Sequence, residues 1–183
     1  MKRVTRQEIL DYVTYEEQRK QIREKIMNIK ELRRINVAGV LSFLFENTDT
    51  VRYQIQEMIR VEHIVKETDI LHEMNTYNEL LGDSGQLGCT LLIEIDDPDE
   101  REEKLTQWLE LTKHLYISLE NKSRIRASFD ERQIGDSRLS SVQYIKFNTG
   151  GKTPVAIGSD LPLLKAETAL TADQKKALSE DLF

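Results

Sequence analysis

The apolar positions between Thr48 and Glu67 recur every three to four residues, the spacing that places them on one face of a helix. That face contains Val51, Ile55, Met58, Ile59, Val61 and Val65. When each residue is rotated by about 100° around the helix axis, Glu62 falls about 20° from the centre of the face, and Gln54 lies at its edge. The pattern therefore predicts a core-facing helix with a carboxylate among its apolar side chains.

A carboxylate in such a position must find a partner or lose its charge, because burying it alone is prohibitively costly. We therefore expect Glu62 to be either part of a structural ion pair or a ligand-binding group in a pocket. Arg33 is a candidate partner, since it follows Ile29 by four residues on the apolar side of a second predicted helix, residues 15–34. Arg34 is the fallback. A solvated helix end, where cations are favoured, explains Arg33 equally well.

Elsewhere the pattern predicts short helices and strands. Capping residues predict helix starts at Thr5, Thr14, Asp69, Asp97 and Thr171, and Asn47, Thr48 or Asp49 can cap the central helix. Alternation with a period of two predicts strands over residues 41–45, 87–95, 115–119, 125–129 and 141–148, with a short strand at 155–157.

Hairpin-length connections dominate the second half of the chain. We therefore predict an α+β fold with a mainly antiparallel sheet of about five or six strands and helices packed on one face. Residues 1–183 are expected to form a single domain, with N-terminal helices over about 5–35 and a C-terminal helix over about 171–182.

Composition narrows the function classes. The 183 residues carry a net charge of −6, which disfavours nucleic acid or an anionic membrane surface as the main partner. The single cysteine, Cys89, excludes an internal disulfide framework and suits a reducing compartment. The start of the chain lacks the apolar segment of a signal peptide, and no apolar run is long enough to cross a bilayer. We expect a cytoplasmic protein.

Motifs for catalysis are sparse. The histidines, His63, His72 and His114, have no metal-binding spacing, and Cys89 lies in a predicted strand, where it is interpreted as a small core residue. The glycine-rich loop over residues 148–154 has one lysine but lacks the full phosphate-loop motif. The sequence supports no particular enzyme class, predicts no metal site and leaves the cofactor unassigned.

The segments FLFENTDTVRYQIQEMIRVEHI, YNELL, TLLIEIDD and SVQYIKF resemble a bacterial family known as domain of unknown function 3501, over nearly the whole chain. The family pattern includes Arg52, Tyr53, Gln54, Gln56, Glu57, Arg60 and Glu62, without a role for any of them. An Asp-His-Pro triplet of the family corresponds here to Asp160-Leu161-Pro162, so the histidine is absent. The resemblance implies gene neighbours that encode rubrerythrin-like proteins and iron–sulfur proteins similar to heterodisulfide reductase subunits.

Two functional hypotheses follow. The first is a non-catalytic accessory or interaction protein, a homodimer that serves a redox or oxidative-stress system with a rubrerythrin-like or iron–sulfur protein as its partner. The second is a small-molecule or metal-binding protein, with enzymatic activity left open, whose pocket surrounds Glu62 and includes Gln54, Glu57 and an arginine.

Overall fold

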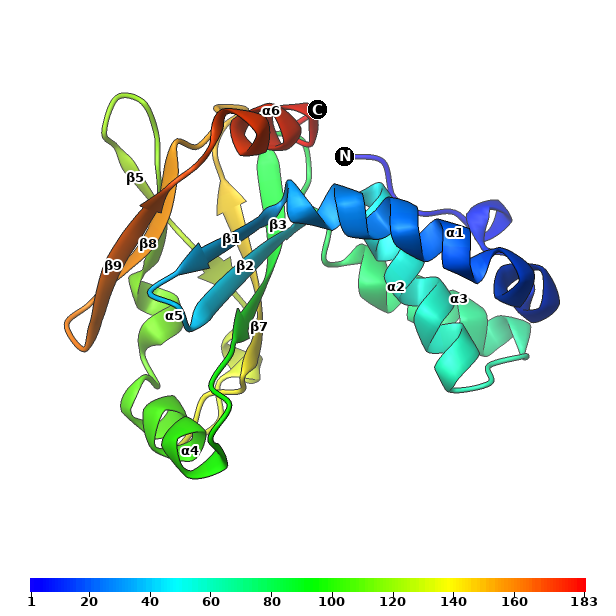
Figure 1. Ribbon diagram of the computed structural model, residues 1–183, viewed down its shortest axis with the longest axis horizontal. Helices are drawn as coiled ribbons and strands as arrows, with labels where there is room; N and C mark the ends of the chain where they lie inside the picture. Colours follow the sequence, from blue (N-terminus) through cyan, green and yellow to red (C-terminus); the bar gives the residue numbers. More distant parts are fainter.

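The computed structural model describes residues 1–183 and shows two lobes that lie side by side (Figure 1). The helical lobe contains η1 (Arg6–Glu8), α1 (Tyr12–Glu31), α2 (Thr48–Val61) and α3 (Glu67–Asn78). The strands of the β lobe are β1 (Arg34–Val37), β2 (Leu41–Glu46), β3 (Gln86–Ile93), β4 (Leu115–Ser118), β5 (Arg124–Arg126), β6 (Ser128–Phe129), β7 (Val142–Asn148), β8 (Ala156–Leu161) and β9 (Leu164–Ala169). Its helices are α4 (Pro98–Gln107), α5 (Leu111–His114), η2 (Glu131–Gln133) and α6 (Ala172–Glu180).

The strands form two antiparallel sheets, one with the order β1-β2-β3-β7-β6 and one with the order β5-β4-β8-β9. The predicted α+β class with antiparallel strands is confirmed. The sequence predicted a single sheet, however, with residues 125–129 as one strand. In the structure Ile125 pairs with Ile117 of one sheet and Phe129 pairs with Ile145 of the other, so the stretch divides at Ala127.

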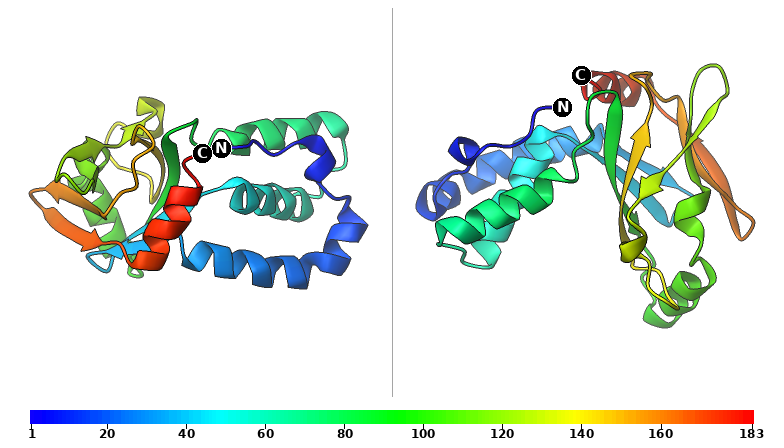
Figure 2. Two further views of the ribbon diagram at one scale, coloured as in Figure 1. Left: turned by 90° about the horizontal axis from the view of Figure 1, so that it is seen from above. Right: turned by 180° about the vertical axis from the view of Figure 1, so that it is seen from behind.

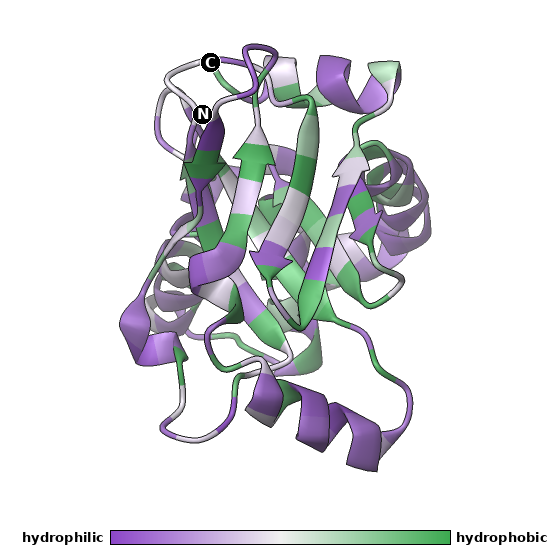
Figure 3. Cartoon of the chain, turned by 90° about the vertical axis from the view of Figure 1, so that its left-hand side faces the viewer, coloured by the Kyte–Doolittle hydropathy of each residue, from purple (hydrophilic) through white to green (hydrophobic).

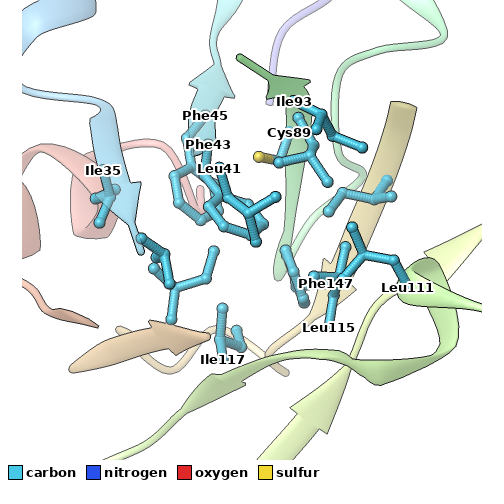
Figure 4. Packing of buried hydrophobic residues seen from close by; sticks show 14 of the residues in the cluster. Ile35, Leu41, Phe43, Phe45, Cys89, Ile93, Leu111, Leu115, Ile117 and Phe147 are labelled. Atoms are coloured by element: carbon cyan, nitrogen blue, oxygen red, sulfur yellow. The ribbon is translucent and has the colours of Figure 1, made fainter. Parts of the chain in front are cut away.

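The main core lies between the two sheets. Phe43, Phe45 and Phe147 of the larger sheet and Ile117 of the smaller one are completely buried there (Figure 4). Figure 3 shows hydrophobic and hydrophilic residues along the strands; in β7 they alternate and only one face is buried, whereas all six residues of β2 are buried. Cys89, which the sequence placed in the core, is 3% exposed, and Trp108 is 5% exposed.

The helical lobe has a separate and smaller core. Its buried apolar residues are Val4, Ile9, Val51, Ile55, Ile59, Ile70 and Leu81. The three from α2 all belong to the apolar face that the sequence predicted, so the prediction is confirmed for the first part of that helix. No helix in the structure is both long and apolar enough to cross a membrane.

Several helix starts agree with the sequence. The capping boxes at Thr5 and Thr171 are present, Asp97 caps α4, and Asn47 caps α2. The predicted start at Thr14 is wrong.

The cap of α1 is Asp11, whose carboxylate accepts hydrogen bonds from the backbone N–H groups of Val13 and Thr14. A carboxylate that accepts hydrogen bonds from two backbone N–H groups satisfies the free donors at the helix start as well as a capping box would. The predicted cap of α3 is also wrong, since that helix starts two residues before Asp69, after Lys66. The edge strands β1 and β9 were not predicted.

Candidate functional site

The predicted site residues do not form one cluster, because most of them lie on different sides of α2. Glu57 faces α1 and is the best connected of them. Its carboxylate accepts hydrogen bonds from the Tyr15 hydroxyl at 2.6 Å and from the Arg19 Nε and Nη2 atoms at 2.7 and 2.8 Å. Arg19 and, to a smaller extent, Tyr15 hold the pKa of Glu57 below its usual value, although burial acts in the opposite direction. Glu57 is therefore an ionised link between two helices.

Arg60 extends this link towards the start of α1. Its Nη1 atom lies 3.3 Å from Glu16, and its Nε atom lies 3.8 Å from Glu57, beyond hydrogen-bond distance. That buried Nε–H has no hydrogen-bond partner in the structure. The Glu57 cluster, which we define as Tyr15, Glu16, Arg19, Glu57 and Arg60, is thus a nearly satisfied polar contact between α1 and α2.

Gln56 and Arg52 bind the segment that precedes α1. The side-chain amide of Gln56 accepts from the Leu10 backbone N–H at 2.5 Å and donates to the Leu10 carbonyl at 3.3 Å. Arg52 forms ion pairs with Asp49 and with Glu8 of η1. Gln54 is half-buried on the side that faces Tyr77 of α3. These three residues therefore fasten neighbouring segments to α2.

Glu62 is exposed, so the expectation that it is buried is wrong. The helix ends at Val61, and the chain reverses through His63, whose φ of 51° is left-handed. The Glu62 carboxylate makes no hydrogen bond or ion pair in the structure. The rotation of about 100° per residue assumes that the helix continues, but α2 ends before Glu62 and Val65, so neither residue keeps its predicted position on the apolar face. Val61, the last residue of α2, and Val65, which lies in the connection to α3, are 56% and 82% exposed.

Arg33 has a different partner from the one predicted. Its Nε and Nη2 atoms donate to the Asp181 carboxylate at 2.6 and 2.9 Å, and both side chains are 8% exposed. Asp181 follows α6, so the pair fastens the end of α1 to the C-terminal helix of the β lobe. The pairing with Glu62 is therefore wrong, and the arginine is structural.

The start of α1 and the turn between α2 and α3 lie at the end of the helical lobe farthest from the β lobe (Figures 1 and 2). Exposed apolar residues of these segments form a patch that was not predicted. We define this tip patch as Tyr12, Val13, Val61 and Val65, which are 40%, 64%, 56% and 82% exposed. The Tyr12 and His63 rings lie 6.0 Å apart, which joins the start of α1 to the turn between α2 and α3. Exposed apolar patches on ordered surfaces commonly mark contact sites.

The attachment of α1 is also unusual. Only Tyr15 and Ile26 of its 20 residues are buried. Polar contacts provide much of the attachment of α1 to α2. Besides the Glu57 cluster, Arg23 donates a hydrogen bond of 3.3 Å to the Tyr53 hydroxyl, and the Lys30 ammonium lies 5.4 Å from the centre of the Tyr53 ring. Ile29, which the sequence placed on the apolar side of this helix, and Ile22 are only half-buried. A long helix with so little apolar cover leaves surface for a further contact.

The β lobe contains a surface cluster around Asp160. Its carboxylate accepts from Arg126 at 2.8 and 2.6 Å and lies 3.0 Å from His114 Nδ1. These contacts, with Arg126 the largest, hold the pKa of Asp160 well below its usual value. The Arg124 guanidinium lies 4.0 Å from the centre of the Tyr116 ring. The cluster closes the outer face of the smaller sheet.

A cavity of about 650 Å³ separates α3 from the edge of the larger sheet. Its walls include Tyr77, Leu80, Phe129, Tyr144 and Lys146. Pockets for small molecules often lie where two lobes meet. The structure contains no group of three or more His, Cys, Asp or Glu side chains arranged to hold a metal ion.

A family model described as "Protein of unknown function (DUF3501)" matches residues 3–182. The chain belongs to this family. A solved structure from Burkholderia pseudomallei, described as a novel protein of unknown function, is 26% identical with a TM-score of 0.91, and the match covers 100% of both chains. No match is found among curated proteins. The fold is thus shared by a protein with 26% sequence identity.

Sequence reasoning missed the residues that make the helical lobe distinctive. Tyr15 and Arg19 are four residues apart and face the same side of α1, so a search for polar pairs at helical spacing could have found them. Val61 and Val65 were identified, but as core residues. Their exposure depends on where the neighbouring helices end, which no local pattern records.

Proposed function

We propose that this DUF3501 protein is a non-catalytic accessory or interaction protein, and that its helical lobe binds a partner protein through the tip patch. The observation that carries the proposal is the exposure of Val61, at 56%, at the end of a helix whose earlier apolar residues form the core of the lobe, and of Val65, at 82%, in the connection that follows. Exposing these side chains to water is unfavourable, and a partner that covers them would recover that free energy.

The surroundings of the tip patch suit a protein contact. Charged pairs flank it, namely Arg60 with Glu16 and a bidentate pair between Arg6 and Glu67 at 2.8 and 3.0 Å. An apolar centre within a polar rim is the usual composition of a protein–protein interface. We therefore expect a partner surface with an apolar centre of similar size.

The redox assignment rests on the family resemblance. The first partners to test are a rubrerythrin-like protein and an iron–sulfur protein similar to a heterodisulfide reductase subunit. We further propose that the protein acts in the cytoplasm, which is supported by the single cysteine, since Cys89 is free and buried.

Binding measurements with matched variants test the proposal. Val61→Glu and Val65→Glu place a charge in the tip patch, and Leu163→Glu is the control, because Leu163 is 64% exposed in the turn between β8 and β9 of the other lobe. We expect each tip variant to weaken partner binding at least about tenfold, as for central interface residues. Leu163→Glu should leave it unchanged. Equal binding by all variants, or equal loss in the control, would contradict the proposed surface.

We also propose that the protein is a homodimer. Sedimentation equilibrium of the purified chain at several concentrations tests this separately. A dimer would support the proposal, and a monomer at every concentration would oppose it.

The small-molecule alternative is favoured by one observation, the cavity of about 650 Å³ between the lobes. Tyr77 and Tyr144 could stack on a planar ligand there, beside Lys146. Native mass spectrometry of freshly purified protein is the test. A retained ligand that is lost in Tyr144→Ala would support this function, whereas retention by the variant would oppose this cavity as the site.

A further inference from the structure

A second cavity, of about 720 Å³, lies at the end of the β lobe that carries α6. Three segments that are far apart in the sequence form its walls: the turn between β4 and β5, the glycine-rich loop before β8, and α6. Figure 1 shows the β4–β5 turn and α6 at the same end of the molecule. This cavity is separate from the tip patch, which lies at the far end of the other lobe.

The charge of this cavity is opposite to that of the chain as a whole. Lys152 comes from the loop, and Lys175 and Lys176 come from α6. None of these lysines forms an ion pair in the structure, and Glu120 is the one acidic residue in the lining. The cavity thus has an excess of positive charge in a protein whose net charge is −6. Lysines that line a cavity without forming ion pairs leave positive charge that an anion can neutralise.

Neutral polar groups accompany the lysines. Thr153, Ser179 and Asn121 line the cavity, and Leu119 and Val155 are its apolar residues. Hydroxyl and amide groups can donate hydrogen bonds to an anion at positions that the lysines do not reach. A mostly polar lining favours a ligand whose charge, rather than its apolar surface, determines binding.

The loop that carries Lys152 is fastened to the sheet. The Gly85 carbonyl accepts from the Thr149 backbone N–H at 3.0 Å and from its hydroxyl at 3.1 Å. Gly150 and Gly151 have φ values of 60° and 80°, so the loop turns through a left-handed conformation that glycine adopts without strain. A loop held in this way presents Lys152 from a fixed position.

We propose that this cavity, which we call the lysine cavity, binds a small phosphorylated molecule that carries at least two negative charges. Lysine binds phosphate as a point charge and needs no special geometry, which suits three lysines that come from two separate segments. The volume lies within the range of small-molecule sites. The net charge of the chain opposes a long polyanion, so a compact ligand is favoured. The loop does not act as a phosphate loop, because strand β8 and not a helix follows it.

Isothermal titration calorimetry with inorganic pyrophosphate tests the proposal. Lys152→Ala and Lys175→Ala each remove one cavity charge, and Lys165→Ala is the matched control, since Lys165 is exposed on β9 outside the cavity. We expect pyrophosphate to bind the native chain, each cavity variant to bind about tenfold more weakly, and the control to bind normally. Thermal melting of each variant checks that the fold is retained.

Other outcomes would overturn the proposal. These are no detectable binding of pyrophosphate, equal weakening by Lys165→Ala, or binding to phosphoinositide-containing vesicles without binding to pyrophosphate. Val65→Glu should leave pyrophosphate binding intact, so failure of the lysine cavity is distinguishable from failure of the tip patch.

Discussion

The ion pair between Arg33 and Asp181 gives the sharpest stability prediction. Asp181→Asn keeps the shape of the side chain but leaves the Arg33 guanidinium buried without a carboxylate. Both side chains are 8% exposed, and two hydrogen bonds of 2.6 and 2.9 Å join them. Removing one partner of a buried pair typically costs about 3–5 kcal/mol, because the other charge is stranded.

Urea denaturation of the native protein and Asp181→Asn measures this cost. In a thermal melt, a loss of about 3–5 kcal/mol corresponds, for a chain of this size, to a fall in Tm of roughly 6–20 °C. Glu94→Gln is the matched control, since Glu94 forms an exposed pair with Arg34 at 3.8 Å. We expect this control to change the free energy of unfolding by about 0–1 kcal/mol. If Asp181→Asn costs no more than Glu94→Gln, the buried pair does not fasten the lobes and the reasoning is refuted.

Three further predictions concern the two lobes. Glu57→Gln should lower the free energy of unfolding by about 1.5–3 kcal/mol in a urea titration, because the substitution removes a carboxylate that accepts charged hydrogen bonds from Arg19. Glu62→Gln should leave the free energy of unfolding unchanged. An equal effect of both substitutions would contradict the exposed position of Glu62. The Arg19 contact lowers the pKa of Glu57, so its stabilisation is present above the ordinary glutamate pKa of about 4.3 and is lost as the pH falls through the lower folded value. The difference between native protein and Glu57→Gln should therefore shrink in acid, and a constant difference down to complete protonation would oppose this assignment. Finally, Trp108 fluorescence, which reports the β lobe, and helical circular dichroism should follow one unfolding transition, since Arg33 and Asp181 couple the lobes; two separate transitions would count against the predicted single domain.

The sequence predicted those elements whose causes are local. The apolar face of α2 is buried at Val51, Ile55 and Ile59, as its spacing indicated. Proline after Asp97 and the capping box at Thr171 mark real helix starts. These features depend on neighbours within one turn, so a single sequence contains the required information.

The remaining features depend on distant residues. Arg33 and Asp181 are separated by 148 positions, and no local pattern could distinguish Asp181 from Glu62 as the partner. Strand β9 is an edge strand in which no residue is fully buried, so it lacks the hydrophobic alternation that identifies strands. The exposure of Val65 depends on where the helical lobe ends.

Photo-crosslinking in cells tests the proposed docking surface most directly. A photoreactive phenylalanine analogue at position 65 lies in the tip patch, and the same residue at position 163 is an equally accessible control on the other lobe. The account predicts a discrete adduct with a rubrerythrin-like or iron–sulfur protein from position 65 and none from position 163. No adduct from position 65, or the same adducts from both positions, would contradict the claim that the helical lobe binds the partner.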